Sequence, residues 1–171
     1  MSDALDLTTL SRRYGLSPDA IPALHKLVAN CEQRLMVDGA YLCEEGRPSD
    51  GLYLLIDGFL RVEKRDAKQV YRQIAVARSP SVLGHMGLVT GVVRTAALSA
   101  EGGARVAVLA KADFDRLMKD VGTTGDALRR LVLSAMLDQA DRAAQDVRRL
   151  LAEAEAGEGF LENDLSGWSS S

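Results

Sequence analysis

Arg94 is an isolated cation in an apolar segment, and Gly84 and Gly87 precede it at short range. Residues 83–97 read Leu-Gly-His-Met-Gly-Leu-Val-Thr-Gly-Val-Val-Arg-Thr-Ala-Ala. Gly84 and Gly87 allow the backbone to approach a ligand closely, and a helical turn starting near His85 would direct unpaired N–H groups at an anion. The planar guanidinium of Arg94 can bind two phosphate oxygens at once. This spacing predicts a site for a small phosphate.

These residues resemble the phosphate-binding cassette of cyclic-nucleotide-binding domains, which occur in catabolite-activator-type regulators, protein kinase A regulatory subunits and cyclic-nucleotide-gated channels. The family pattern is roughly Phe-Gly-Glu-Leu-Ala-Leu, a short turn, and then Pro-Arg-Ala-Ala-Thr-Val. Without a gap, the matching residues are Gly84, Gly87, Leu88, Arg94 and Ala96. The resemblance extends to opening strands in residues 39–58 and to a closing strand and short helix in residues 109–118. It covers about residues 30–155.

The resemblance implies where a ligand would bind. The phosphate and ribose would contact Gly84, His85, Met86, Gly87, Leu88, Arg94 and Thr95. His85 stands where the family has a glutamate that accepts hydrogen bonds from the ribose 2′-hydroxyl. A neutral imidazole offers one acceptor and one donor in place of two carboxylate oxygens. The base would meet the long C-terminal helix at Asp141 or at Arg142. The implied ligand is cyclic AMP or cyclic GMP, and neither a cofactor nor a metal ion is implied.

The elements that must position this site change character along the chain. Residues 1–32 are expected to be helical, because a Ser-Pro-Asp start signal at residues 17–19 is followed by apolar residues at helical spacing. Residues 33 to about 109 read as short strands separated by turn residues, among them Asp57-Gly58 and Gly102-Gly103, within a β-roll domain expected over residues 33–120. Such spacing favours a sandwich, roll or barrel. The resemblance implies an antiparallel β-roll of the jelly-roll or double-stranded β-helix kind, between flanking helices.

Residues 121–156 are predicted to form one long helix. Apolar residues recur in steps of three and four, the a/d repeat of a coiled coil, at Leu133, Met136, Ala140, Ala143, Val147, Leu150 and Ala154. We favour a homodimer through this helix, as in dimeric members of the family; the alternative is that the apolar face packs on its own β-roll. Residues 157–171 are predicted to be a flexible tail, with docking through Phe160 and Trp168 as the alternative.

Composition and charge argue against several classes of protein. The net charge is −3 and Lys and Arg are scattered, which does not favour nucleic-acid binding. No apolar run reaches the roughly 18–20 residues of a membrane span, and the acidic N-terminus does not resemble a signal peptide. We therefore expect a cytoplasmic protein. Cys31 and Cys43 lack metal-ligand spacing and are expected to be free thiols. Without a nucleophile motif or a histidine cluster, the sequence indicates neither an enzyme nor a metalloprotein.

Two hypotheses of different classes follow. In the first, a cyclic nucleotide binds to the cassette, the C-terminal helix shifts, and the signal passes to a downstream protein. In the second, the fold is a protein-interaction or scaffold module without nucleotide, and Arg94 pairs with an internal acid or with carbonyl oxygens. A DNA-binding domain would need roughly 70 further residues, so we expect a stand-alone domain. A third hypothesis is that protonation of His85 strengthens phosphate binding in mild acid.

Overall fold

The protein has twelve helical and strand elements in its described part. The computed structural model describes residues 7–165, and the side chains of residues 7–156. In chain order the elements are α1 (Leu7–Arg13), a 3₁₀ turn η1 (Pro18–Ala20), α2 (Ile21–Ala29), β1 (Glu32–Val37), β2 (Tyr41–Cys43), β3 (Gly51–Arg65), β4 (Tyr71–Arg78), β5 (Ser81–Leu83), α3 (His85–Thr90), β6 (Ala97–Ala110), α4 (Lys111–Lys119) and α5 (Thr123–Leu165). The chain divides into two units, one up to Met136 and one from Leu137 onward.

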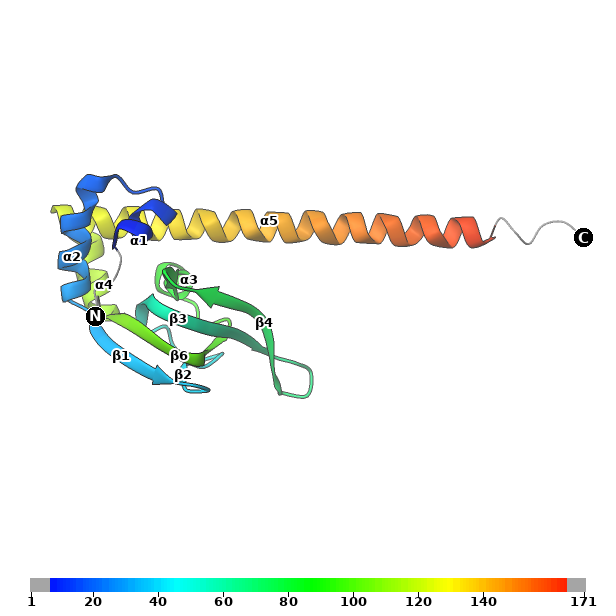
Figure 1. Ribbon diagram of the computed structural model, residues 1–171, viewed down its shortest axis with the longest axis horizontal. Coiled ribbons are helices and arrows are strands. Elements are labelled where there is room, and N and C mark those ends of the chain that lie inside the picture. The colour runs from blue at the N-terminus through cyan, green and yellow to red at the C-terminus, as the bar shows by residue number, and fades with distance from the viewer. Residues whose placement is uncertain (1–6, 166–171) are drawn as a thin grey trace, which may run out of the picture. The chain divides into compact units, whose positions relative to one another are not determined.

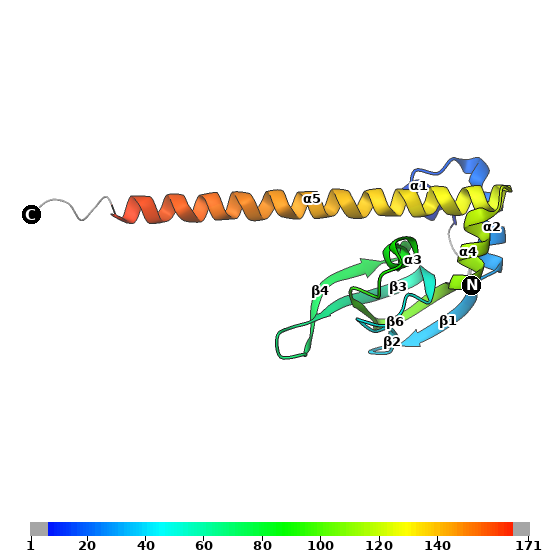
Figure 2. The ribbon, with the colours of Figure 1, turned by 180° about the vertical axis from the view of Figure 1, so that it is seen from behind.

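Two long strands, β3 and β6, form the centre of one antiparallel sheet (Figure 1). The main order is β1-β6-β3-β4, while β2 also pairs with β6 and β5 also pairs with β3. Figure 2 shows the same arrangement from behind, with β1 and β4 at opposite edges of the sheet. The expected antiparallel β-roll with helices before it and a long helix after it is confirmed.

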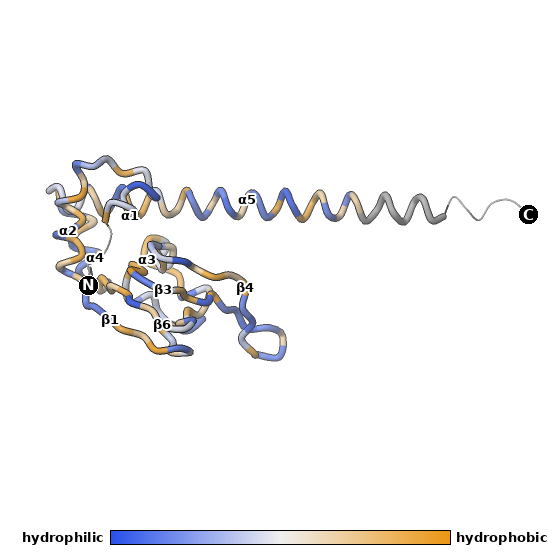
Figure 3. The backbone as a smooth tube through the Cα atoms, in the orientation of Figure 1, coloured by the Kyte–Doolittle hydropathy of each residue, from blue (hydrophilic) through white to orange (hydrophobic). Residues whose placement is uncertain are grey.

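Strand β3 separates two hydrophobic clusters. Leu52 and Leu54 pack with the apolar side chains of α1, α2, α4 and the first turns of α5, whereas Tyr53 and Leu55 pack inside the roll. Because successive side chains of a strand point to opposite faces, a strand buried on both faces reads as a continuous apolar run. Figure 3 shows this run as a hydrophobic stretch of β3. Helices α1, α2, α4 and the first turns of α5 therefore pack on one face of β3, and this helical cluster forms one end of the first unit.

Two predicted turns are wrong, because Asp57-Gly58 and Gly102-Gly103 lie inside continuous strands. The register between β3 and β6 shifts on both sides of Asp57-Gly58, as it does at a β-bulge. Gly58 has a φ of +85°, and a Cβ on it would lie 2.2 Å from the carbonyl oxygen of Gly103. Glycine at positive φ serves a bulge as readily as a turn, so its presence does not distinguish the two.

Helix α5 changes its surroundings along its length. Leu128, Leu131 and Ala135 belong to the helical cluster of the first unit, and Met136 packs against that cluster. Every residue in 139–156 is exposed. The helix ends at Leu165, so the predicted tail begins inside it. The side chain of Phe160 and all of Trp168 lie outside the described residues. No helix within residues 7–165 is both long and apolar enough to span a membrane.

Candidate phosphate site

Helix α3 is the short helical turn that the sequence predicted, and it begins directly after Gly84. We call residues 84–95 the cassette. Gly84 has a φ of +78°, and a Cβ on it would lie 2.4 Å from Nη1 of Arg94 and 3.2 Å from the carbonyl oxygen of Gly51. The glycine is therefore needed to make room for the guanidinium, a role that its sequence position did not indicate.

Gly87 makes room for a different neighbour, the loop between β2 and β3. A Cβ on Gly87 would lie 1.9 Å from Oγ of Ser49 and 2.9 Å from the carbonyl oxygen of Val92. The Ser49 hydroxyl donates a hydrogen bond of 2.9 Å to that same carbonyl. Side-chain and backbone contacts thus fasten the β2–β3 loop, residues 44–50, to the cassette.

Arg94 is buried, with 5% of its surface exposed. Its Nη1 donates to the Gly84 carbonyl at 2.9 Å, and its Nη2 donates to the Gly51 carbonyl at 2.6 Å and to Oδ1 of Asp50 at 2.8 Å. The guanidinium carbon lies 4.6 Å from the centre of the Tyr53 ring, a cation–π distance. Three acceptors and one aromatic ring therefore fix the orientation of the charge.

The Arg94 guanidinium also has an N–H donor that forms no hydrogen bond within the described residues. Its three hydrogen bonds use three of five N–H groups, and Nε is buried with no hydrogen-bond partner within the described part of the chain. A buried donor without a partner costs about 1–3 kcal/mol, so an anionic oxygen placed there would be stabilised. The internal pairing of Arg94 is what the scaffold hypothesis expected. The scaffold hypothesis gives no reason for a buried Nε without a hydrogen-bond partner.

Asp50 and Tyr53 belong to the site and were missed by sequence analysis. The Tyr53 hydroxyl donates to Oδ1 of Asp50 at 2.7 Å. Burial alone would raise the pKa of Asp50, but hydrogen bonds from Arg94 and Tyr53 outweigh it and leave that pKa below its usual value. Burial, followed by the hydrogen bond to Asp50, raises the pKa of Tyr53. One sequence signal was available: an acid just before a strand whose aliphatic run contains a single tyrosine.

The remaining cassette residues differ in exposure. His85 and Leu88 are buried, Met86 is half-buried, and Thr95 is exposed. Leu88 belongs to the hydrophobic cluster that also holds the first turns of α5. The cassette thus presents the polar side chains of Thr90 and Thr95 to solvent and connects to the helical cluster through Leu88.

The two predicted base contacts lie on the second unit. Asp141 and Arg142 are exposed on α5, and the Arg142 guanidinium pairs with the carboxylate of Asp138 one turn earlier. Such i,i+4 pairs stabilise an isolated helix by about 0.2–0.5 kcal/mol. Their role toward a nucleotide base stays a prediction.

Both cysteines are free and half-buried, as expected. Burial, with a smaller contribution from the charge of Asp113, raises the pKa of Cys31 to about 12. Burial also raises the pKa of Cys43, although the positive charge of Arg94 opposes the shift. Both thiols are therefore protonated at neutral pH. Within the described residues, no group of three or more His, Cys, Asp or Glu side chains is placed to hold a metal ion.

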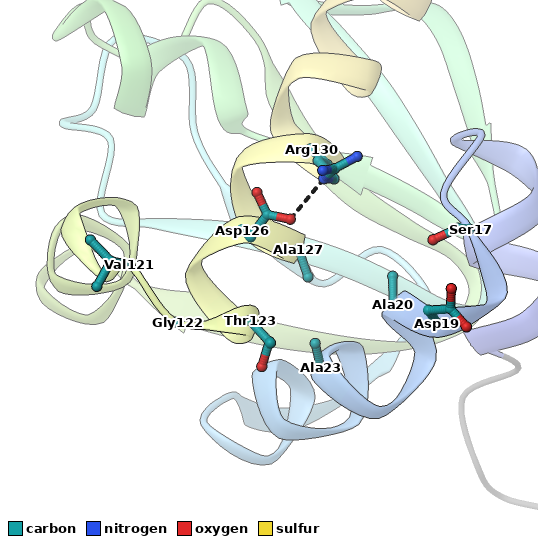
Figure 4. Close-up of a pocket in the computed structure, with 10 residues that line it drawn as sticks. All are labelled: Ser17, Asp19, Ala20, Ala23, Val121, Gly122, Thr123, Asp126, Ala127 and Arg130. Atoms are coloured by element: carbon teal, nitrogen blue, oxygen red, sulfur yellow. Dashed lines mark hydrogen bonds and ion pairs between the residues drawn. The ribbon is translucent and has the colours of Figure 1, made fainter.

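A hollow of about 280 Å³ lies at the helical end of the first unit (Figure 4). Its lining residues are Ser17, Asp19, Ala20, Ala23, Val121, Gly122, Thr123, Asp126, Ala127 and Arg130. Asp126 and Arg130 form an ion pair of 2.8 Å beside it. No cassette residue lines this hollow, so it is distinct from the candidate phosphate site.

Comparison with known families identifies the fold of the cassette and its sheet. The model of the cyclic nucleotide-binding domain matches residues 34–121, which is more than half of the chain. The chain belongs to the cyclic nucleotide-binding domain family. A search of curated protein sequences found no significant match.

Several solved structures share this fold. The c-di-GMP responsive global regulator CLP of Xanthomonas campestris is similar with a TM-score of 0.65 and 16% identity over 78% of this chain and 64% of that one. The catabolite activator protein of Thermus thermophilus is similar with a TM-score of 0.63 and 22% identity over 84% and 62%. A cyclic nucleotide-binding domain from Methylobacillus flagellatus is similar with a TM-score of 0.66 and 21% identity over 78% of this chain and 73% of that one. The chain therefore spans less than two thirds of the length of the first two proteins.

Proposed function

We propose that this member of the family is a cytoplasmic, non-catalytic regulatory domain that senses a cyclic nucleotide through its cassette. The observation that supports this function best is the buried Arg94, held by three acceptors while Nε keeps an unused donor. A phosphate oxygen at Nε would form a charge-assisted hydrogen bond, which is roughly twice as strong as a neutral one. Asp50 and Tyr53 restrain the guanidinium, so little side-chain entropy would be lost when the ligand binds.

The ligand we propose is cyclic AMP or cyclic GMP. Its phosphate would lie between Arg94 and the backbone N–H groups at the start of α3, with exposed Thr95 as a further donor. The ribose would lie near His85, and the base near Asp141 or Arg142. A solved relative of similar fold is described as responsive to c-di-GMP, so a cyclic dinucleotide belongs in every binding test.

The proposed signal passes through Leu88 and α5. Leu88 packs in the same cluster as Leu128 and Leu131, which lie in the first turns of α5. A ligand that moved α3 would therefore change the packing against that helix. We propose that α5 pairs with its copy in a homodimer and passes the change to a downstream protein.

Binding is tested by calorimetry and thermal unfolding with cyclic AMP, cyclic GMP and c-di-GMP. A ligand at 100 times its Kd should add about 2.7 kcal/mol to the free energy of unfolding. Arg94→Lys keeps the charge but loses the forked donors, and should weaken binding at least tenfold. Arg130→Lys, on the hollow that no cassette residue lines, is the matched control and should leave affinity unchanged. No stabilisation by any of the three nucleotides at millimolar concentration would favour the scaffold hypothesis.

Ribose recognition is tested separately by His85→Glu. Because a carboxylate offers two acceptor oxygens to the 2′-hydroxyl, this variant should bind cyclic AMP several-fold more tightly than the natural chain does. The same variant should bind 2′-deoxy cyclic AMP no more tightly. An equal gain for both nucleotides would show that residue 85 does not contact the 2′-hydroxyl.

A further inference from the structure

Positive charge is concentrated in one contiguous segment of the chain, although Lys and Arg are scattered over the rest of it. The basic hairpin, residues 61–78, comprises the end of β3, a turn and β4. It carries six basic and two acidic side chains, although the whole chain has a charge of −3. Arg61 pairs with Asp38, and Arg72 pairs with Asp66. Four further cations form no ion pair within the described residues: Lys64, Arg65, Lys68 and Arg78.

Strand β4 is also an open edge of the sheet, as Figures 1 and 2 show. Within the described residues it pairs only with β3, and the register of that pairing shifts at Ile74. From Ala75 to Arg78, alternate N–H and C=O groups point away from the sheet. The Arg78 carbonyl lies on this open side, where it accepts a hydrogen bond from Arg13. By strand alternation the backbone of Val76 faces the same side. Ile74 and Val76 are exposed by 59% and 44%.

We infer that the open edge of β4 binds an acidic, extended segment of a partner protein as an added strand. The backbone of that segment pairs with the unpaired groups of β4, which supplies affinity that does not depend on side chains. Its carboxylates meet Arg78 and the Nη groups of Arg72, whose Nε donates to Asp66, and its alternate apolar side chains cover Ile74 and Val76. Guanidinium groups suit carboxylates because the two can pair in a bidentate way.

The surface disfavours the other occupants of such an edge. A second copy of β4 in the antiparallel register centred on Ala75 would bring Arg72 opposite Arg78, and like charges directly opposite are destabilising. Single-stranded nucleic acid binds through bases stacked on open aromatic faces. Here the Arg78 guanidinium lies 5.1 Å from the Phe59 ring centre, and that of Arg65 lies 5.0 Å from the Tyr71 ring centre. Each ring already has a guanidinium on one face.

The probe is a fluorescein-labelled nine-residue peptide of alternating Glu and Val, with a Lys-Val peptide as its charge-reversed control. We expect the acidic peptide to bind by anisotropy, to shift the NMR amide signals of β4, and to weaken as salt rises. The Lys-Val peptide should not bind. Failure of the acidic peptide to bind at millimolar concentration overturns the proposal. The proposal is also overturned if the protein binds a nine-residue thymidine oligonucleotide or phosphatidylserine vesicles through β4 more tightly than it binds the acidic peptide.

Two variants separate charge recognition from strand addition. The double variant Arg72→Gln with Arg78→Gln should weaken the acidic peptide at least tenfold, whereas Arg116→Gln with Lys119→Gln on α4 removes the same charge elsewhere and should not. Val76→Pro removes an N–H on the open side, where proline is tolerated in edge strands, and should weaken binding at least tenfold with the thermal unfolding midpoint retained. Unchanged affinity in the β4 variants overturns the proposal.

Discussion

The cassette and the distal part of α5, residues 139–156, differ in where their charged and apolar side chains find partners. Two of the three acceptors of Arg94 lie far away in the chain; the Asp50 carboxylate is 44 residues distant and the Gly51 carbonyl is 43. In α5 the ion pairs join close neighbours, such as Asp146 with Arg149 and Arg149 with Glu153. Leu88 of the cassette reaches a core, although Val89, Val92 and Val93 are exposed, whereas each residue in 139–156 remains exposed.

This contrast separates a cation whose orientation is set by tertiary contacts from a helix whose side chains are exposed. In the cassette, tertiary contacts fix one cation in one orientation before any ligand arrives. Distal α5 is held by helical propensity and short-range pairs, and helices of this kind gain most of their stability from packing an apolar face. A substitution in the cassette should therefore change the stability of the folded domain, and one in distal α5 should change its association.

The largest expected effect comes from removing the buried cation. Arg94→Ala leaves two buried carbonyl oxygens and Asp50 without their donor, so the free energy of unfolding should fall by about 3 kcal/mol. Arg149→Ala removes an arginine that is 63% exposed and should cost no more than about 0.5 kcal/mol. Urea denaturation measures both values. Equal losses would erase the contrast between the two regions.

The next effect tests the fit between the cassette and the β2–β3 loop. Gly87→Ala places a Cβ against Ser49 and Val92, and overpacking of this kind costs about 1–3 kcal/mol. Gly103→Ala is the control, because its nearest contact would be 3.6 Å and its φ is not positive. Thermal unfolding of the two variants should differ clearly. An unchanged unfolding midpoint for Gly87→Ala would show that the β2–β3 loop can move away from the added methyl group at little cost.

The association of α5 provides a third test. Val147 is 55% exposed and lies on the predicted apolar stripe. Val147→Asp should weaken self-association at least tenfold, which corresponds to about 1.4 kcal/mol, while Gln145→Asp adds the same charge on the opposite side of the helix and should not. Sedimentation equilibrium measures the effect. A natural chain that stays monomeric at high concentration contradicts the homodimer.

The smallest effect concerns acid pH. Because the pKa of Asp50 in the folded protein is lowered from an ordinary value of 3.8, its stabilisation is present above that value and is lost as pH falls through the lower, folded pKa. The natural chain should lose free energy of unfolding as pH falls below about 4, and Asp50→Asn should lose less. The difference should be under about 1 kcal/mol, because the Asp50 side chain is 67% exposed and solvent screens its charge. Denaturation at several pH values measures the slope. An unchanged slope would show that Arg94 does not stabilise the ionised carboxylate.

Local patterns predicted the cassette helix, the flanking helices and most strands. The start of α3 after Gly84 follows from residues adjacent in the chain, and so does the apolar face of α2 at Leu24 and Leu27. The residues Asp57-Gly58 and Gly102-Gly103 predict turns but form bulges, because a glycine at positive φ suits both. What decides between them is whether a neighbouring strand continues to pair past the glycine.

The sequence by itself determined that one arginine and two glycines form a unit, because their spacing is local and the cassette pattern is specific. The tertiary structure alone decided what each of them does. Gly84 admits the guanidinium, Gly87 admits Ser49, and Arg94 is oriented by Asp50, Gly51 and Tyr53. These partners are distant in the chain, and a hydrogen bond depends on distance and direction in space, which short-range residue patterns do not encode.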